Sequence, residues 1–157
     1  MFPFLRMFQR RKMFSDGEID LLLSDTDVSD AECGIIDGFL FYIYNRKSRK
    51  YAGYVSLRLG ESSALYYLGH IGYRIEPEWR GNHYAEKACR LLLPLLEELG
   101  LESVVITTDV DNIPSRRTCE RLGCELERIA PVPEKYRAVC SGSTAKCRYI
   151  FVSGDGE

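Results

Sequence analysis

The chain has 157 residues, of which 45% are hydrophobic and 28% charged, and its formal net charge is −2 at pH 7. These values predict one globular domain over residues 1–157, and the slightly acidic balance argues against a dedicated nucleic-acid-binding protein. No apolar run approaches the roughly 20 residues of a membrane span, and basic residues interrupt the N-terminal apolar stretch, so we expect no stable membrane insertion, no secretory signal and a cytoplasmic location.

The N-terminal part divides into a basic and an acidic segment. Residues 1–14 carry four phenylalanines and four positive charges, and we interpret them as an extension that packs its phenylalanines on the domain. The alternative is an amphipathic helix at an acidic surface or bilayer. Residues 16–37 are rich in Asp and Glu. They hold a predicted strand at Ile19–Leu23 and a polar loop, which we interpret as solubilising, although such a segment can attract a cationic ligand.

Strand patterns dominate the next forty residues. Phe39–Tyr44 and Tyr51–Leu59 alternate in polarity and are separated by a charged turn, which predicts a hairpin. Leu65–Ile75 is predicted as the following strand. Its two glycines, Gly69 and Gly72, indicate a bulge or the close approach of another group.

The stretch from Gly69 to Ala85 is the strongest candidate for a ligand site. Pro77 ends the strand, and Arg80 and Gly81 lead into a helix that begins near Tyr84. Unpaired N–H groups and the helix dipole favour an anion at such a helix start, and Arg80 adds a formal positive charge. The pattern therefore predicts an anion-binding loop.

Tyr84–Leu99 has the clearest helical periodicity in the chain. Pro94 lies inside it and predicts a kink, and Gly100 is suited to cap its C-terminus. Ser103–Thr108 is an apolar β-branched run, typical of a strand in a parallel pair. The helix would then be a right-handed crossover between parallel strands.

A second helix is predicted to open within Asp109–Ser115, with Asn112 or the preceding aspartate as its N-cap. Cys124–Ala130 and Lys146–Val152 are the last predicted strands, joined by a long loop that carries Tyr136. The six cysteines form no Cys-x-x-Cys pair and only two histidines are present, so we predict no metal site and interpret the cysteines as reduced, small hydrophobic residues.

Two motifs in this order carry a resemblance to a known family. Their residues are Arg80, Tyr84 and Ala85 in the first, and Asn112, Ser115, Leu122 and Gly123 in the second. Over roughly residues 51–152 the chain resembles the GNAT superfamily of acyl-CoA-dependent N-acetyltransferases. The family's pyrophosphate loop is (Arg or Gln)-x-x-Gly-x-(Gly or Ala), and His83 stands in place of its central glycine.

The resemblance implies an α/β fold with a mixed, mostly antiparallel twisted sheet, a parallel central strand pair and flanking helices. It implies acetyl-CoA as co-substrate, with Asn112 hydrogen-bonded to the pantetheine arm, and a homodimer through the last strands. The residues implied to bind acetyl-CoA are Tyr73, Ile75, Arg80, Gly81, Asn82, His83, Tyr84, Ala85, Asn112 and Ser115.

Catalysis needs a base for the amine and a proton source for the leaving thiolate. His70 is the first candidate base because its ordinary pKa is near 6.5, with a hydrogen-bonded strand histidine as the alternative and Glu76 as the second candidate. The family's usual acid is a tyrosine seven residues after the asparagine, where this chain has Cys119. The acid is therefore Cys119, another tyrosine such as Tyr73 or Tyr136, or water.

The predicted function is direct transfer of an acetyl group from acetyl-CoA to a primary amine in a ternary complex. The acceptor is expected to be a small molecule or a peptide, and its identity is left open. The alternative is a non-catalytic acyl-CoA-binding sensor or interaction module, which the replacements at His83 and Cys119 favour.

Overall fold

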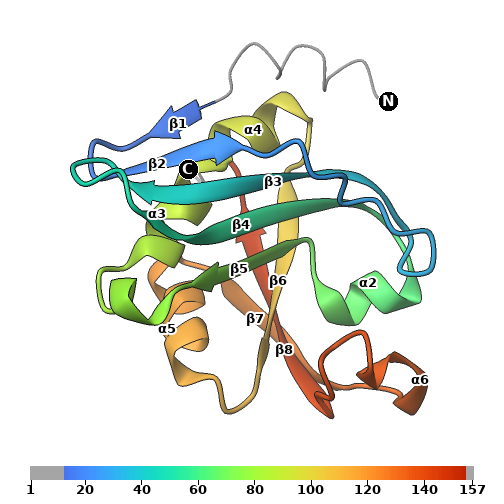
Figure 1. Ribbon diagram of the computed structural model, residues 1–157. Helices are drawn as coiled ribbons and strands as arrows, with labels where there is room; N and C mark the ends of the chain where they lie inside the picture. Colours follow the sequence, from blue (N-terminus) through green and yellow to red (C-terminus); the bar gives the residue numbers. More distant parts are fainter. Residues whose placement is uncertain (1–12, 155–157) are drawn as a thin grey trace.

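The computed structural model describes residues 13–154, which form one eight-stranded sheet with helices against it (Figure 1). The strands are β1 (Met13–Ser15), β2 (Ile19–Leu23), β3 (Ile35–Asn45), β4 (Tyr51–Gly60), β5 (Ile71–Ile75), β6 (Ser103–Asp109), β7 (Glu125–Pro131) and β8 (Ala145–Val152). The helices are α2 (Ser63–Leu68), the 3-10 turn η1 (Pro77–Trp79), α3 (Tyr84–Leu91), α4 (Leu93–Glu98), α5 (Ile113–Arg121) and α6 (Glu134–Arg137).

The sheet has the order β1-β2-β3-β4-β5-β6-β8-β7, and every neighbouring pair is antiparallel except β5 and β6. These two parallel strands share a single registered pair, Ile71 with Ile106, and diverge beyond it (Figure 1). The mixed, mostly antiparallel sheet with a parallel central pair and flanking helices confirms the predicted fold class.

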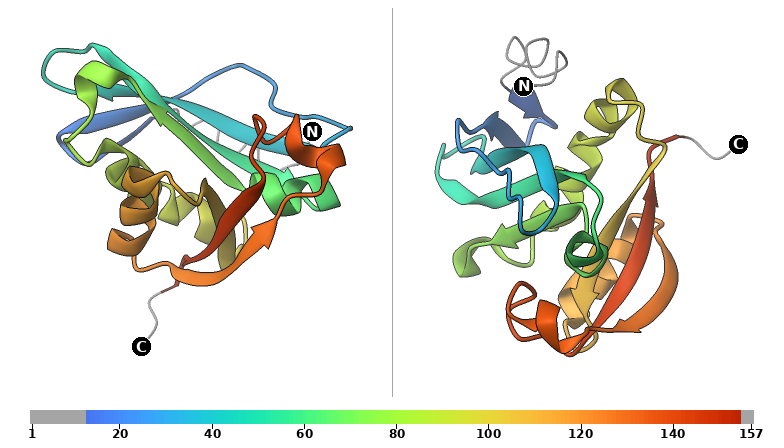
Figure 2. Two further views of the ribbon diagram at one scale, coloured as in Figure 1. Left: turned by 90° about the horizontal axis from the view of Figure 1, so that it is seen from below. Right: turned by 90° about the vertical axis from the view of Figure 1, so that its right-hand side faces the viewer.

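The two faces of the sheet are covered differently (Figure 2). Cys147 and Tyr149 of β8 point into the main core, which also contains residues of α3, α4 and α5. Because side chains alternate along a strand, the intervening Arg148 points to the other face, where it contacts Tyr66 of α2. Helices α3, α4 and α5 thus lie on one face and α2 on the other.

Helix α2 replaces the first half of the strand predicted at Leu65–Ile75. The Ser62 side chain caps it by accepting a hydrogen bond from the Leu65 N–H at 2.9 Å, and Gly69 ends it with a φ of 82°. The helix buries Ala64 and Leu65 against residues of the preceding loop and β3. A run of five apolar or aromatic residues does not distinguish helix from strand by its period, so the cap was the informative signal.

The other predicted elements appear close to their expected places. The predicted kink at Pro94 is a break between two helices, because α3 ends at Leu91 and α4 begins at Leu93.

Gly72 allows the predicted close approach of another group, since a Cβ added there would overlap the guanidinium of Arg58. Phe14 packs edge-on against Phe41 with ring centroids 5.7 Å apart.

The prediction for residues 1–12 lies outside the described residues. Between residues 13 and 154, no helix has the length and apolarity needed to cross a bilayer. The six cysteines are free thiols, and all except Cys124 are buried.

Candidate functional site

A cleft opens beside the point where β5 and β6 diverge, with a volume of about 610 Å³. We call it the β5–α5 cleft. Its lining comes from β5 (Tyr73, Arg74, Ile75), the following loop (Trp79, Arg80, Gly81, His83), the start of α3 (Tyr84, Ala85) and α5 (Asn112, Pro114, Ser115, Arg117, Thr118, Arg121). The predicted anion-binding loop therefore forms one wall of a real cavity.

The loop is held in place by its own backbone and by Arg80. The Arg80 Nε donates a hydrogen bond to the carbonyl of Ile75 at 3.0 Å, which fixes the guanidinium at the end of β5. Gly81 has a φ of 86° and His83 a φ of 59°, so two left-handed residues turn the chain into α3. The N–H groups of the first turn of α3 lie at this cleft, where they and the helix dipole favour an anion.

His83 keeps the backbone conformation that a glycine would adopt more easily. The left-handed region costs a non-glycine residue about 1–2 kcal/mol. We expect His83→Gly to raise the free energy of unfolding by about 1 kcal/mol and to leave binding of the expected co-substrate, acetyl-CoA, intact or stronger. Chemical denaturation and calorimetric titration measure the two effects. A stability loss, or a clear loss of affinity, would instead mean that the imidazole makes a contact that glycine cannot replace.

Positive charge dominates the cleft. Four arginines line it (Arg74, Arg80, Arg117 and Arg121), and among the residues that the structure describes no carboxylate does. Arg121 is held by Glu86 of α3 at 3.1 Å, and Arg74 pairs with Glu76 at 3.5 Å. A surface of this kind suits a ligand that carries several phosphates.

Tyr73 and Ser115 join the two walls of the cleft. The Tyr73 hydroxyl oxygen lies 2.6 Å from the Ser115 Oγ, and the Ser115 N–H donates to the Asn112 Oδ1 at 3.3 Å. Asn112 is therefore the N-cap of α5, as predicted, and lines the cleft as well. Burial raises the pKa of Tyr73 well above its ordinary value, so the hydroxyl keeps its proton at neutral pH.

The candidate general acid Cys119 lies outside the β5–α5 cleft. It is fully buried in the main core and does not line the cleft. A hydrogen bond with Cys124 and burial both raise the pKa of the Cys119 thiol. A thiol enclosed in this way cannot contact a ligand in the cleft, so the structure argues against Cys119 as the general acid. Asn82 is exposed and also lies outside the lining, since its side chain turns back to donate to the Trp79 carbonyl at 2.9 Å.

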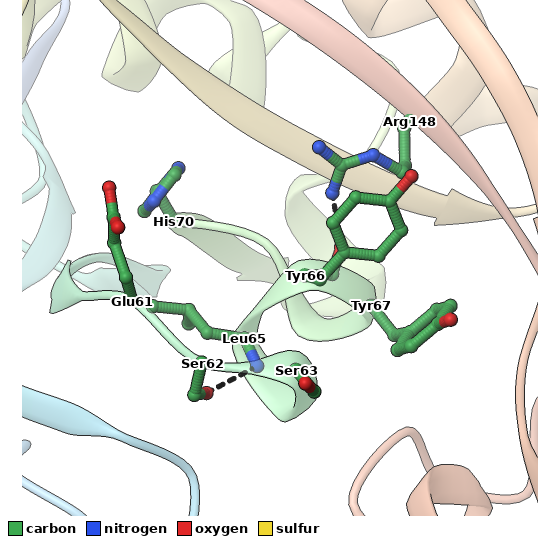
Figure 3. Close-up of a pocket in the computed structure, with 8 residues that line it drawn as sticks. All are labelled: Glu61, Ser62, Ser63, Leu65, Tyr66, Tyr67, His70 and Arg148. Atoms are coloured by element: carbon green, nitrogen blue, oxygen red, sulfur yellow. Dashed lines mark hydrogen bonds between the residues drawn. The ribbon is translucent and has the colours of Figure 1, made fainter.

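A second cavity of about 640 Å³ lies on the opposite face of the sheet, beside α2 (Figure 3). We call it the α2 cavity. Its lining residues are Glu61, Ser62, Ser63, Leu65, Tyr66, Tyr67, His70 and Arg148. Tyr136, expected from the resemblance near the acceptor side, stacks on Tyr67 with ring centroids 5.7 Å apart. Candidate base His70 therefore faces this cavity and not the β5–α5 cleft.

The hydrogen bonds of His70 limit what it can do. The Val105 N–H donates to the His70 Nδ1 at 3.0 Å, so the neutral ring carries its proton on Nε2. The carbonyl of Gly60 also hydrogen-bonds the ring. Both nitrogens are thus engaged with backbone groups of neighbouring strands. This arrangement is at odds with a general base, which needs a lone pair directed at the substrate, and agrees with the alternative of a hydrogen-bonded strand histidine.

His70 also makes stability depend on pH. Burial and the charges of Arg148 and Arg58 lower its pKa, against a smaller opposing effect of Glu61 and the Gly60 carbonyl. The unfolded chain then binds a proton near pH 6.5 that the folded chain does not, so stability falls as pH decreases below about 6.5. The slope stays under the ~1.4 kcal/mol per pH unit of one full proton. Denaturation between pH 7.5 and 5.5 should show this slope, and a His70→Asn variant should lack it.

The sequence placed nine of its ten predicted cofactor-binding residues in the β5–α5 cleft, Asn82 being the exception. It did not bring the candidate catalytic groups together, because His70 and Glu76 lie at opposite ends of β5 and Cys119 lies in the core. It missed the six other lining residues: Arg74, Trp79, Pro114, Arg117, Thr118 and Arg121. The helical spacing of 114, 117, 118 and 121 places those α5 residues on one face, and that spacing was a usable signal.

Comparisons with known proteins agree with this geometry. Residues 10–125 match the family model described as the acetyltransferase (GNAT) domain. The chain therefore belongs to the GNAT acetyltransferase family and is an enzyme of the acyltransferase class. No curated protein matches the sequence.

Several solved structures share the fold. The ribosomal-protein-S5-alanine acetyltransferase of Vibrio fischeri is 13% identical, with a TM-score of 0.67 over 92% of this chain and 98% of that one. The microcin C7 self-immunity acetyltransferase MccE, solved with acetyl-CoA and AMP, is 24% identical, with a TM-score of 0.56 over 73% and 61%. The spermidine/spermine N-acetyltransferase SpeG of Vibrio cholerae is 15% identical, with a TM-score of 0.55 over 74% and 67%.

Proposed function

We propose that the chain transfers an acetyl group from acetyl-CoA to the primary amine of a small-molecule or peptide acceptor, by direct attack in a ternary complex. Acetyl-CoA would occupy the β5–α5 cleft. The observation that carries the proposal is the coincidence of an arginine-lined cleft, a helix N-terminus and a parallel strand pair joined at one residue pair only. The diverging strands leave backbone groups of β5 available to an extended ligand.

The lining residues fit the chemistry of such a ligand. The N–H groups of the first turn of α3, with Arg80 and Arg117, would hold the phosphates. Asn112 and Ser115 supply neutral polar groups at the N-terminal end of α5, as an amide-containing arm requires. The absence of carboxylates from the lining, within the described residues, removes the charge that would oppose phosphate binding.

We assign Tyr73 the proton transfer at sulfur. The amine nitrogen forms the new C–N bond and releases a proton to water, the C–S bond breaks, and the departing sulfur takes its electron pair. The Tyr73 hydroxyl, neutral because burial raises its pKa, donates to that sulfur. Ser115, 2.6 Å away, can stabilise the resulting tyrosinate by donating a hydrogen bond, and the proton that the amine released returns to Tyr73 through water. This assignment replaces Cys119 by one of the tyrosines that the sequence left open.

Titration calorimetry with acetyl-CoA, CoA and dephospho-CoA tests the cleft. We expect micromolar binding of acetyl-CoA that Arg80→Ala weakens about tenfold, the size of one charge-assisted contact. Arg128→Ala is a matched control, since Arg128 is exposed on β7 and outside the cleft. Absence of binding to the wild-type chain would overturn the proposal. Tight binding without turnover on any amine would favour an acyl-CoA-binding sensor instead.

A further inference from the structure

The α2 cavity has a buried cation at one end. Arg148 is only 7% exposed, and its Nε has no hydrogen-bond partner among the described residues. Its guanidinium lies 3.5 Å from the ring centroid of Tyr66 and donates to the Tyr66 carbonyl. Its carboxylate partner is Glu127, at a long 3.4 Å and on a side chain that is 39% exposed. A buried guanidinium normally has closer compensation than this.

The other end of the same cavity is acidic. Figure 3 shows the Glu61 carboxylate beside the His70 ring, across the cavity from Arg148 and Tyr66. Within the described part of the chain Glu61 forms no ion pair. The cavity therefore presents separated negative and positive groups, with Tyr66 and Leu65 supplying apolar surface between them.

We propose that the α2 cavity binds the acetyl acceptor, and that this acceptor is a small zwitterion, an amine that also carries a carboxylate, as a free amino acid does. The ammonium group would lie at Glu61 and the carboxylate at Arg148. This inference rests on the proposed acetyl transfer and narrows it to one class of acceptor. A cavity of about 640 Å³ has the size of an ordinary small-molecule site.

The Glu61 end of the α2 cavity is the end nearest to the proposed acetyl-CoA cleft, as attack by the amine requires. The backbone N–H of His70 donates to the backbone carbonyl of Val105 at 2.8 Å, next to Ile71 and Ile106, the one registered pair of β5 and β6. Because Glu61 lies beside the His70 ring, the acidic end of the cavity is also next to this pair. Beyond that pair the strands diverge, and the β5–α5 cleft begins on the opposite face of the sheet. An amine at the acidic end is therefore on the side of the cavity that is nearest to the cleft.

The same charges disfavour a polyamine. A chain with several ammonium groups that filled the cavity would bring one of them to Arg148, where like charges repel in a desolvated site. A carboxylate there gains hydrogen bonds from a guanidinium that has lost most of its hydration. The cavity thus discriminates by charge between amino acids and the amines that lack their carboxylate.

The first experiment compares matched pairs of amines. Phenylalanine with phenethylamine, leucine with isoamylamine and lysine with cadaverine differ only in the carboxylate, and spermidine is added as a polyamine. With saturating acetyl-CoA, we expect kcat/KM for the preferred amino acid to exceed that for its decarboxylated partner by roughly 10- to 100-fold, the range of a charged hydrogen bond. Equal or greater activity on spermidine or on the decarboxylated amines would overturn the proposal.

Two variants with opposite expected effects on KM test whether the carboxylate of the bound amino acid lies at Arg148. Arg148→Gln should raise KM for the amino acid about tenfold or more and leave the decarboxylated amine unchanged. Glu127→Gln removes the competing carboxylate from an exposed side chain, so it should lower KM for the amino acid while the fold is kept. Glu125→Gln, the same substitution at an exposed residue of β7 that pairs with Ile150 and not with Arg148, is the control that should change neither. An unchanged KM in Glu127→Gln would contradict the assignment even if Arg148→Gln fails to fold.

A binding measurement separates this inference from the proposed function. Calorimetric titration of the chain with the same amino acids and their decarboxylated partners needs no turnover. Amino-acid binding that Glu127→Gln strengthens supports the zwitterion site even if acetyl-CoA is not bound. If acetyl-CoA binds while none of the amino acids does, acetyl transfer can stand and the zwitterion assignment falls.

Discussion

Tyr73→Phe should lower kcat for acetyl transfer about 10²-fold, the lower end of what a positioned acid or base contributes. The variant removes the one hydroxyl that reaches from β5 to Ser115 across the cleft, at 2.6 Å. It keeps the ring, which packs against the core, so the affinity for acetyl-CoA should change less than about threefold. Steady-state kinetics with a saturating amine, together with calorimetric titration of acetyl-CoA, separate the two effects.

Cys119→Ala is the matched comparison for that experiment. It removes the side chain at the position where the family has its tyrosine, but the Cys119 thiol is buried and hydrogen-bonded to the thiol of Cys124. We expect it to reduce stability through the lost packing, by about 1–2 kcal/mol, and to leave kcat within a factor of two. The reverse pattern, a large kcat loss in Cys119→Ala and full turnover in Tyr73→Phe, would return the proton transfer to the helix cysteine.

The order of the elements could be read from the sequence because each has a local cause. Pro77 ends β5, Asn112 caps α5, Pro94 interrupts the helix between α3 and α4, and the β-branched run of β6 is typical of a buried parallel strand. Most of the residues that the motif spacing singled out line one cleft, since a loop and a helix N-terminus bring their own backbone groups to a ligand.

The roles of individual side chains were harder to predict, because they depend on contacts between segments far apart in the chain. Nothing near His70 in sequence shows that the Val105 N–H engages its Nδ1. On α5, Cys119 is only one helical turn beyond Ser115, yet its short side chain points into the core while the longer Tyr73 reaches the cleft from β5. The α2 cavity depends on Arg148, which is 82 residues from Tyr66 in sequence.

Gly53→Ala should destabilise the fold by about 3 kcal/mol, the sum expected for overpacking and an unfavourable backbone conformation. Gly53 of β4 pairs with Ile75 at the end of β5, beside a bulge between β3 and β4. A Cβ built there would overlap the carbonyl oxygen of Arg74, a backbone atom that cannot move without separating the two strands. Chemical denaturation measures the loss.

The consequence of that clash reaches the cleft, because the Ile75 carbonyl holds the Nε of Arg80. Gly53→Ala should therefore weaken acetyl-CoA binding even at temperatures where the variant is folded. Gly123→Ala is the control: its φ of 77° is also unfavourable, but an added Cβ meets no atom within 4 Å, so it should cost only about 1 kcal/mol and leave binding unchanged. Equal losses in the two variants would show that backbone conformation alone, and not the close packing of β4 on β5, makes glycine necessary at position 53.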